Sequence, residues 1–189
     1  MKKLAVLGFA AAMAVNVAFA GDLKSGLQPG ASVGAFTVEK VCGNPNDNVA
    51  EGKSLCYRCM LGSKPVVMVF TRTTNDSLAS LVKELDSTLP KHEDAKLSSF
   101  VNLIGSADAK ELKTAAKEFG EKTKTENIAI VVPKDSENGP EAFSISPEAE
   151  VTVIIYRDGK VAANHAFGEG KLDKDGIAAV IADTVKVVN

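Results

Sequence analysis

Apolar and polar residues along this chain follow two different periods, which predicts that strands alternate with helices. The longest unbroken apolar run, VVMVF, begins directly after Pro65. Such a run is typical of a strand buried on both faces, as in a parallel sheet. Further strands are predicted at 97–104, 128–132, 151–156 and 161–167. Three sets of apolar residues recur at helical spacing: Leu78, Leu81, Val82, Leu85 and Leu89; Leu112, Ala115, Ala116 and Phe119; and Ile177, Val180, Ile181 and Val185.

Turn and cap residues mark the ends of these segments. The stretch 73–76 supplies N-cap residues for the first helix, Pro90 ends it, and Asp173 caps the last helix. The Asp-Gly pair within 157–160 predicts a β-hairpin between the last two strands. A further strand at 33–41 is predicted to lie at an edge of the sheet.

The first twenty residues have the pattern of a cleaved export signal. Two lysines precede a largely apolar run that ends in an A-x-A cleavage site at residues 18–20. The run is short for a membrane span, which needs roughly 20 residues. We therefore expect a signal peptide at 1–20, a flexible leader at 21–32 and one domain at 33–189, exported to the periplasm or the cell exterior.

Composition and charge argue against several classes of function. The 22 basic and 24 acidic residues are interspersed and give a net charge of −2. There is no basic patch of the kind that binds nucleic acid, and no later stretch apolar enough to span a membrane. No Gly-rich phosphate loop or Ser-His-Asp constellation stands out. Neither a cofactor nor a nucleic-acid partner is expected.

The Cys-x-x-Cys pair formed by Cys56 and Cys59 is the main chemical candidate. The oxidising side of a membrane favours a disulfide, and this spacing makes Cys56–Cys59 the expected bridge. One interpretation is a redox pair, in which the charge of Arg58 lowers a thiol pKa. The alternatives are a structural bridge or, third, a metal site. Tyr57 and Arg58, between the cysteines, are candidate partner-binding residues.

The third cysteine, Cys42, lies 14 positions before Cys56. It is interpreted as a resolving thiol, a third metal ligand or a small buried residue, the commonest state of a free cysteine. His92 lies in a charged run and His165 in the last predicted strand, so a Cys₃His zinc site is conceivable although its spacing is irregular. We expect Cys42 to stay reduced.

The succession of elements from Pro65 to Val187 resembles the thioredoxin-like fold. The extra strand at 128–132 makes it more similar to peroxiredoxins and exported thiol reductases. The stretch LCYRC…PVVMVFTR also resembles a group of secreted bacterial thioredoxin-like proteins of little-defined function. The resemblance implies an α/β fold, a thioredoxin-like three-layer sandwich with a mixed central sheet. It further implies thiol–disulfide exchange with protein thiols or disulfides of the cell envelope.

The chain departs from the family's site pattern. In thioredoxins the Cys-x-x-Cys motif opens the first main helix, whereas here 73–76 has no cysteine and the pair precedes the strand. Val151 stands where the family has a cis-proline, and Glu150 stands near the place of a peroxiredoxin arginine. We therefore expect no peroxidase activity. The pair at Cys56 and Cys59 either exchanges disulfides or is a structural bridge in a noncatalytic binding module.

Overall fold

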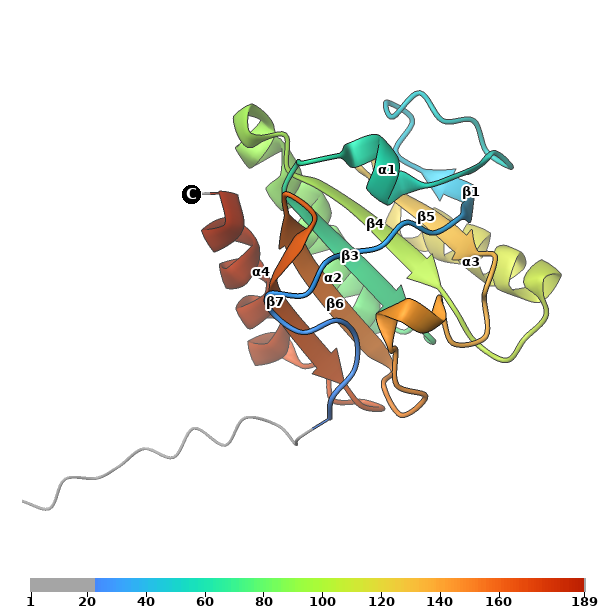
Figure 1. The fold of residues 1–189 in the computed structure, drawn as a ribbon. Coiled ribbons are helices and arrows are strands. Elements are labelled where there is room, and N and C mark those ends of the chain that lie inside the picture. Colours follow the sequence, from blue (N-terminus) through green and yellow to red (C-terminus); the bar gives the residue numbers. More distant parts are fainter. Residues whose placement is uncertain (1–22, 189) are drawn as a thin grey trace, which may run out of the picture.

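The computed structural model describes residues 23–188, which form one seven-stranded mixed sheet with helices and loops on its two faces (Figure 1). The strand order is β2-β1-β5-β4-β3-β6-β7. The predicted signal peptide at 1–20 lies outside the described residues. The strands are β1 Val38–Gly43, β2 Ser54–Leu55, β3 Val66–Thr71, β4 Ser98–Leu103, β5 Ile128–Pro133, β6 Val151–Arg157 and β7 Lys160–Phe167.

Strand β3 is the centre of the fold, as its apolar run predicts. It pairs in parallel with β4 and antiparallel with β6, so that Val66 lies opposite both Ser98 and Tyr156. Every residue of β3 is buried. Because side chains alternate between the two faces of a strand, its residues contribute to two hydrophobic cores, one on each side of the sheet.

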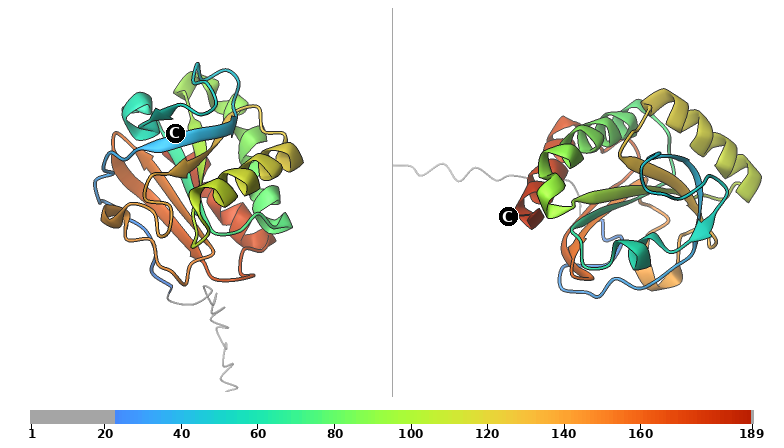
Figure 2. Two further views of the ribbon diagram at one scale, coloured as in Figure 1. Left: turned by 90° about the vertical axis from the view of Figure 1, so that its right-hand side faces the viewer. Right: turned by 90° about the horizontal axis from the view of Figure 1, so that it is seen from above.

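Three long helices cover one face of the sheet (Figure 2). They are α2 Asp76–Thr88, α3 Ala109–Thr123 and α4 Lys174–Val188. Each begins where a polar side chain accepts backbone hydrogen bonds, Asn75 for α2, Asp108 for α3 and Asp173 for α4. The predicted apolar stripes face the sheet and form the larger core, except for Val185 of α4, next to which Thr184 is the buried residue.

The opposite face is covered by shorter elements. These are the short helix α1 Tyr57–Leu61, the 3₁₀ turn η2 Glu141–Phe143 and the extended segment before β1 (Figure 2). A second 3₁₀ segment, η1 Leu89–Ala95, follows α2. Aromatic rings fill the space beneath the covering elements, with Phe36 packed against Phe70, Phe100 and Phe143. The result is the expected three-layer sandwich, with one layer made largely of loops.

The predicted hairpin forms between β6 and β7. Asp158 and Gly159 both have positive φ angles, 53° and 71°, as a two-residue type I′ turn requires. The first strand differs from the prediction. It begins at Val38 rather than Val33, and it is not at the edge, because β2 pairs with its outer side and β5 with its inner side. The two-residue β2 is too short to leave a sequence pattern.

The segment expected to be a flexible leader packs against the sheet from residue 23 onwards. The hydroxyl of Ser25 is buried and lies 2.6 Å from that of Thr152. The side-chain amide of Asn164 donates to the carbonyls of Ser25 and Leu27. These hydrogen bonds satisfy polar groups on β6 and β7 and fix the polar N-terminal segment to these two strands. Within the described residues, no helix is both long and apolar enough to cross a membrane.

Candidate redox site

The short helix α1 is a single turn between β2 and β3 (Figure 1). Cys59 lies on it, and Cys56 directly precedes it. Gly62 ends the turn with a φ of 61°, a conformation that favours glycine, and the chain then reaches Pro65 and β3. Gly62 and Pro65 thus leave room for only one helical turn between the motif and β3. Because α1 has only five residues, its own hydrogen bonds cannot hold it, and it depends on its side-chain contacts.

A disulfide joins Cys56 to Cys59, and Cys42 is free. Cys56 is the N-cap residue of α1, and its sulfur accepts a hydrogen bond from the backbone N–H of Cys59 at 3.1 Å. Cys59 is exposed, whereas Cys56 is partly covered. The neighbouring Met60 is 44% exposed and is the one large hydrophobic residue exposed within 23–188. Cys59 is therefore the more exposed residue of the bridge, and the sulfur of Cys56 is hydrogen-bonded.

Tyr57 anchors the motif to the core. Its ring is buried and stacks on Phe100 with 5.3 Å between the ring centroids. Its hydroxyl donates a 2.5 Å hydrogen bond to Oδ2 of Asp47. Burial, and then the hydrogen bond and charge of Asp47, raise the pKa of Tyr57 far above its usual range. Tyr57, predicted as a partner-binding residue, therefore points into the protein as a protonated donor.

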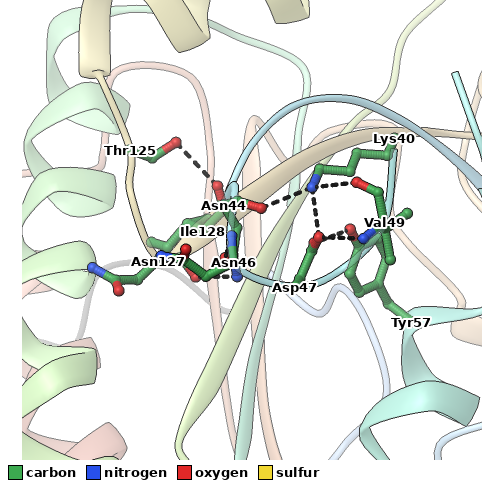
Figure 3. A network of polar contacts seen from close by, with 9 residues as sticks. All are labelled: Lys40, Asn44, Asn46, Asp47, Val49, Tyr57, Thr125, Asn127 and Ile128. Atoms are coloured by element: carbon green, nitrogen blue, oxygen red, sulfur yellow. Dashed lines mark hydrogen bonds and ion pairs between the residues drawn. The ribbon is translucent and has the colours of Figure 1, made fainter. Parts of the chain in front are cut away.

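Asp47 belongs to a buried ion pair that sequence reasoning did not identify (Figure 3). Lys40, on β1, donates through Nζ to Oδ1 of Asp47 at 2.6 Å and to the carbonyls of Asn44 and Val49. The side chains of Lys40 and Asp47 are only 3% and 7% exposed. Asp47 also accepts from the N–H of Val49. Both charges are thus paired and further hydrogen-bonded, as buried charges require.

Arg58 holds the other side of α1. Its Nε donates to the carbonyl of Val33 at 3.0 Å, and its guanidinium lies so close to Gly159 that a side chain there would overlap it. This is its one side-chain hydrogen bond within 23–188, and no ion pair to Arg58 occurs there. Arg58 therefore ties α1 to the N-terminal segment and to the β6–β7 turn, and its hydrogen bonding is not directed to either sulfur.

Cys42 lies on the other face of the sheet from α1. A β-bulge between Lys40 and Cys42 makes Val41 an extra residue, so Lys40 pairs with Val131 and Cys42 with Ile130. The Cys42 side chain consequently packs with the helix-covered core, and its sulfur lies 3.4 Å from the Ala116 carbonyl of α3.

Burial, together with the nearby Glu51 and Glu121, raises the pKa of Cys42 to about 11. Of the three interpretations of Cys42, that of a small, partly buried and unreactive cysteine therefore agrees with the structure. Because the sheet separates it from the disulfide, it cannot serve as the resolving thiol.

The conceivable zinc site is not assembled. His92 lies in η1, and His165 on β7 has its Nε2 3.0 Å from Asp183 of α4. Cys42 is separated from the other cysteines by the sheet. In the part of the chain that the structure describes, no three His, Cys, Asp or Glu side chains come close enough to hold a metal ion.

At the start of α2, where thioredoxins carry their cysteines, Glu150 forms two hydrogen bonds. Asn75 acts as a plain helix cap, accepting from the N–H of Leu78, and its amide nitrogen donates to Oε1 of Glu150 at 2.6 Å. Oε2 of Glu150 accepts from the N–H of Gly170. All described peptide bonds are trans, including Glu150–Val151. An open cavity of about 630 Å³ lies here, but no cysteine lines it.

Comparison with solved structures identifies the fold of the chain. A candidate thiol:disulfide interchange protein DsbE from Chlorobium tepidum aligns over 86% of this chain and 99% of its own, with a TM-score of 0.65 at 11% identity. A candidate protein disulfide isomerase from Bacteroides thetaiotaomicron aligns over 87% and 92%, with a TM-score of 0.60 at 14% identity. The chain has the thioredoxin-like fold. BsSco, a member of the Sco family of cytochrome c oxidase assembly proteins, also shares it, with a TM-score of 0.54, 14% identity and coverage of 88% and 99%.

At these identities the likeness extends to the fold and no further. No protein-family model matches the sequence, and no curated protein is recognisably similar to it. Within this thioredoxin-like fold, the Cys-x-x-Cys pair lies on α1 before β3, while the start of α2 carries Asn75 and Asp76. The candidate redox chemistry of this chain is therefore that of α1 and its surroundings.

Proposed function

We propose that this protein exchanges disulfides with protein thiols of the cell envelope through Cys56 and Cys59. The observation that carries the proposal is the asymmetry of the bridge. Cys59 is exposed, and Cys56 has a hydrogen-bond donor at its sulfur. A thiolate that leaves a disulfide is stabilised by a hydrogen bond from a backbone N–H. The fold shared with thiol:disulfide interchange proteins is consistent with the proposal, and the signal-like N-terminus supports export.

The asymmetry assigns a role to each cysteine. A thiolate of a partner dithiol attacks Sγ of Cys59, a new S–S bond forms, and the Cys56–Cys59 bond breaks. Cys56 leaves as the thiolate that accepts the N–H of Cys59. The partner's second thiolate then attacks the partner's own sulfur in the mixed disulfide and releases Cys59. The partner is oxidised by two electrons, the pair is reduced, and the protons of the two partner thiols pass to solvent or to the released sulfurs. The reverse sequence reduces a partner disulfide.

Single-cysteine variants test the proposal. We expect the wild type to accelerate the reduction of insulin by dithiothreitol, and the Cys56→Ser and Cys59→Ser variants to lose this activity. Cys42→Ser, on the other face of the sheet, is the matched control and should retain it. Without dithiothreitol, the mixed disulfide that Cys59 of Cys56→Ser forms with insulin has no internal resolving thiol and should accumulate. Absence of turnover by the wild type would refute the exchange function and favour a structural bridge.

A further inference from the structure

The two residues between the cysteines are both fixed to other parts of the molecule. Arg58 is bonded to Val33, and Tyr57 connects α1 to Asp47. Asp47 in turn is held by Lys40 on β1 (Figure 3). A continuous chain of contacts therefore runs from strand β1, through a buried ion pair, to the middle of the Cys-x-x-Cys motif.

The ion pair is rigid because every group in it is engaged. The three donors of the Lys40 ammonium have three acceptors, at 2.6, 2.8 and 2.9 Å. Asp47 accepts from Lys40, from the N–H of Val49 and from Tyr57. In a site shielded from water such bonds are strong, and a partner left without its counterpart is costly. The Tyr57 hydroxyl consequently meets a fixed acceptor and cannot readily exchange it for water.

We infer that Lys40 and Asp47 are positioning residues that, through Tyr57, set the reduction potential of the Cys56–Cys59 pair. The inference deepens the proposed exchange function and rests on it. In the oxidised protein the disulfide itself keeps α1 in its turn. In the reduced protein that covalent constraint is gone, and a five-residue helix has little stability of its own. The contact of Tyr57 with Asp47 then keeps the two thiols facing each other, which favours their oxidation.

The direction of the effect follows from this difference. When the Tyr57 anchor is removed, reduced α1 gains conformational freedom that the oxidised turn cannot gain. The reduced form is therefore stabilised relative to the oxidised form, and the disulfide becomes easier to reduce. For one hydrogen bond to a charged acceptor we expect the equilibrium constant for reduction to rise roughly tenfold, which is about 30 mV for a two-electron couple.

The test is an equilibrium titration of the pair against dithiothreitol, in which the protein disulfide becomes two thiols as the reagent is oxidised. Tyr57→Phe removes the hydroxyl and keeps the ring on Phe100. Asp47→Asn keeps the size of the acceptor and removes its charge. Lys113→Gln is the matched control, because Lys113 pairs with Glu39 at 2.7 Å, next to Lys40 on β1, in a half-exposed ion pair. Urea unfolding of both redox states accompanies each titration.

We expect Tyr57→Phe and Asp47→Asn to be reduced at roughly tenfold lower ratios of dithiothreitol to its oxidised form, and Lys113→Gln to match the wild type. The double variant should shift no further than the larger single shift, since both changes break one contact. If Tyr57→Phe lowers the stability of both redox states equally and leaves the potential unchanged, the role is only structural and the inference is overturned. Tyr57→Phe decides the matter even if Asp47→Asn fails to fold.

This readout is separate from turnover with a protein substrate. If insulin reduction fails but the potential shifts as expected, the exchange proposal is lost and the positioning role stands. If the wild-type bridge resists dithiothreitol, reduction of Tyr57→Phe under the same conditions would support the inference. Equal resistance of the two proteins would overturn it.

Discussion

Removal of the disulfide is the perturbation that best separates a redox pair from a structural bridge. In the double variant Cys56→Ser/Cys59→Ser the covalent link across α1 is lost, while the serine at position 56 keeps an N-cap acceptor for the N–H of residue 59. The rest of the anchoring of α1, by Tyr57 and Arg58, does not involve sulfur. The loss of stability should therefore come almost entirely from the freed unfolded chain.

The magnitude follows from the small size of the closed loop. A disulfide restricts the unfolded chain in proportion to the logarithm of loop length, and a loop closed by cysteines three positions apart corresponds to about 2 kcal/mol at 25 °C. The variant should unfold with a free energy lower by no more than this. Its melting temperature should fall by about 4–8 °C, while insulin reduction is abolished.

The assay is urea unfolding of the oxidised wild type, the reduced wild type and the double variant under identical conditions. The reduced wild type and the double variant should have nearly equal unfolding free energies, because both lack the same link. A loss of about 4 kcal/mol or more in the double variant would contradict the reasoning. It would mean that the bridge holds the fold together and that α1 is not anchored by its other side chains.

Further predictions concern the N-terminus, the free thiol and the hydrogen bonds of Glu150 at the start of α2. We predict that the exported protein begins at Gly21, and an intact mass that retains residues 1–20 would contradict this. Because the pKa of Cys42 is raised to about 11 in the folded state, its contribution to stability is complete below pH 9 and is lost between pH 9 and 11. Urea unfolding of Cys42→Ser should show a smaller decline over this range, because only the buried tyrosines still contribute to it, and an equal decline in both proteins would refute the assignment. Glu150→Ala breaks two hydrogen bonds and should lower the unfolding free energy by about 1–3 kcal/mol without altering insulin reduction, whereas a loss of activity would implicate the α2 position. Thiol-dependent peroxide turnover should be absent, and turnover that disappears in Cys56→Ser would overturn that prediction.

The elements with a long, clear period could be predicted from the sequence. The run at β3, the stripes of the three long helices and the Asp-Gly hairpin each express a local preference that agrees with the fold. The helix α1 and the strand β2 could not be predicted in the same way. They span five and two residues, and their conformation depends on partners distant in the sequence, such as the ring of Phe100 beneath Tyr57.

The cysteine pairing could be anticipated from its spacing, but the surroundings of the pair could not. From the sequence pattern alone, Lys40 is indistinguishable from an ordinary surface lysine of a strand, and Asp47 from an ordinary turn residue. Their contact requires the loop between β1 and β2 to fold back over the strand, which no periodicity encodes. The one available signal was the alternation of β1, which places Lys40 on the same face as buried Val38. Arg58 was assigned to a thiol because it is adjacent in sequence, yet its bond goes to Val33.

The extra residue at Val41 determines on which face of the sheet the free thiol of Cys42 lies. Without the bulge, strict alternation would put Cys42 on the face of Lys40 and Val38, the face that α1 covers. A third sulfur on that side could attack the bridge from within and shuffle it to a non-native pairing, a reaction that oxidising compartments do not suppress. The inserted residue moves the side chain of Cys42 to the other face of the sheet. The free thiol is thereby kept away from the Cys56–Cys59 disulfide. Intramolecular scrambling is thus suppressed by strand geometry, while Cys59 stays exposed on the side away from Cys42.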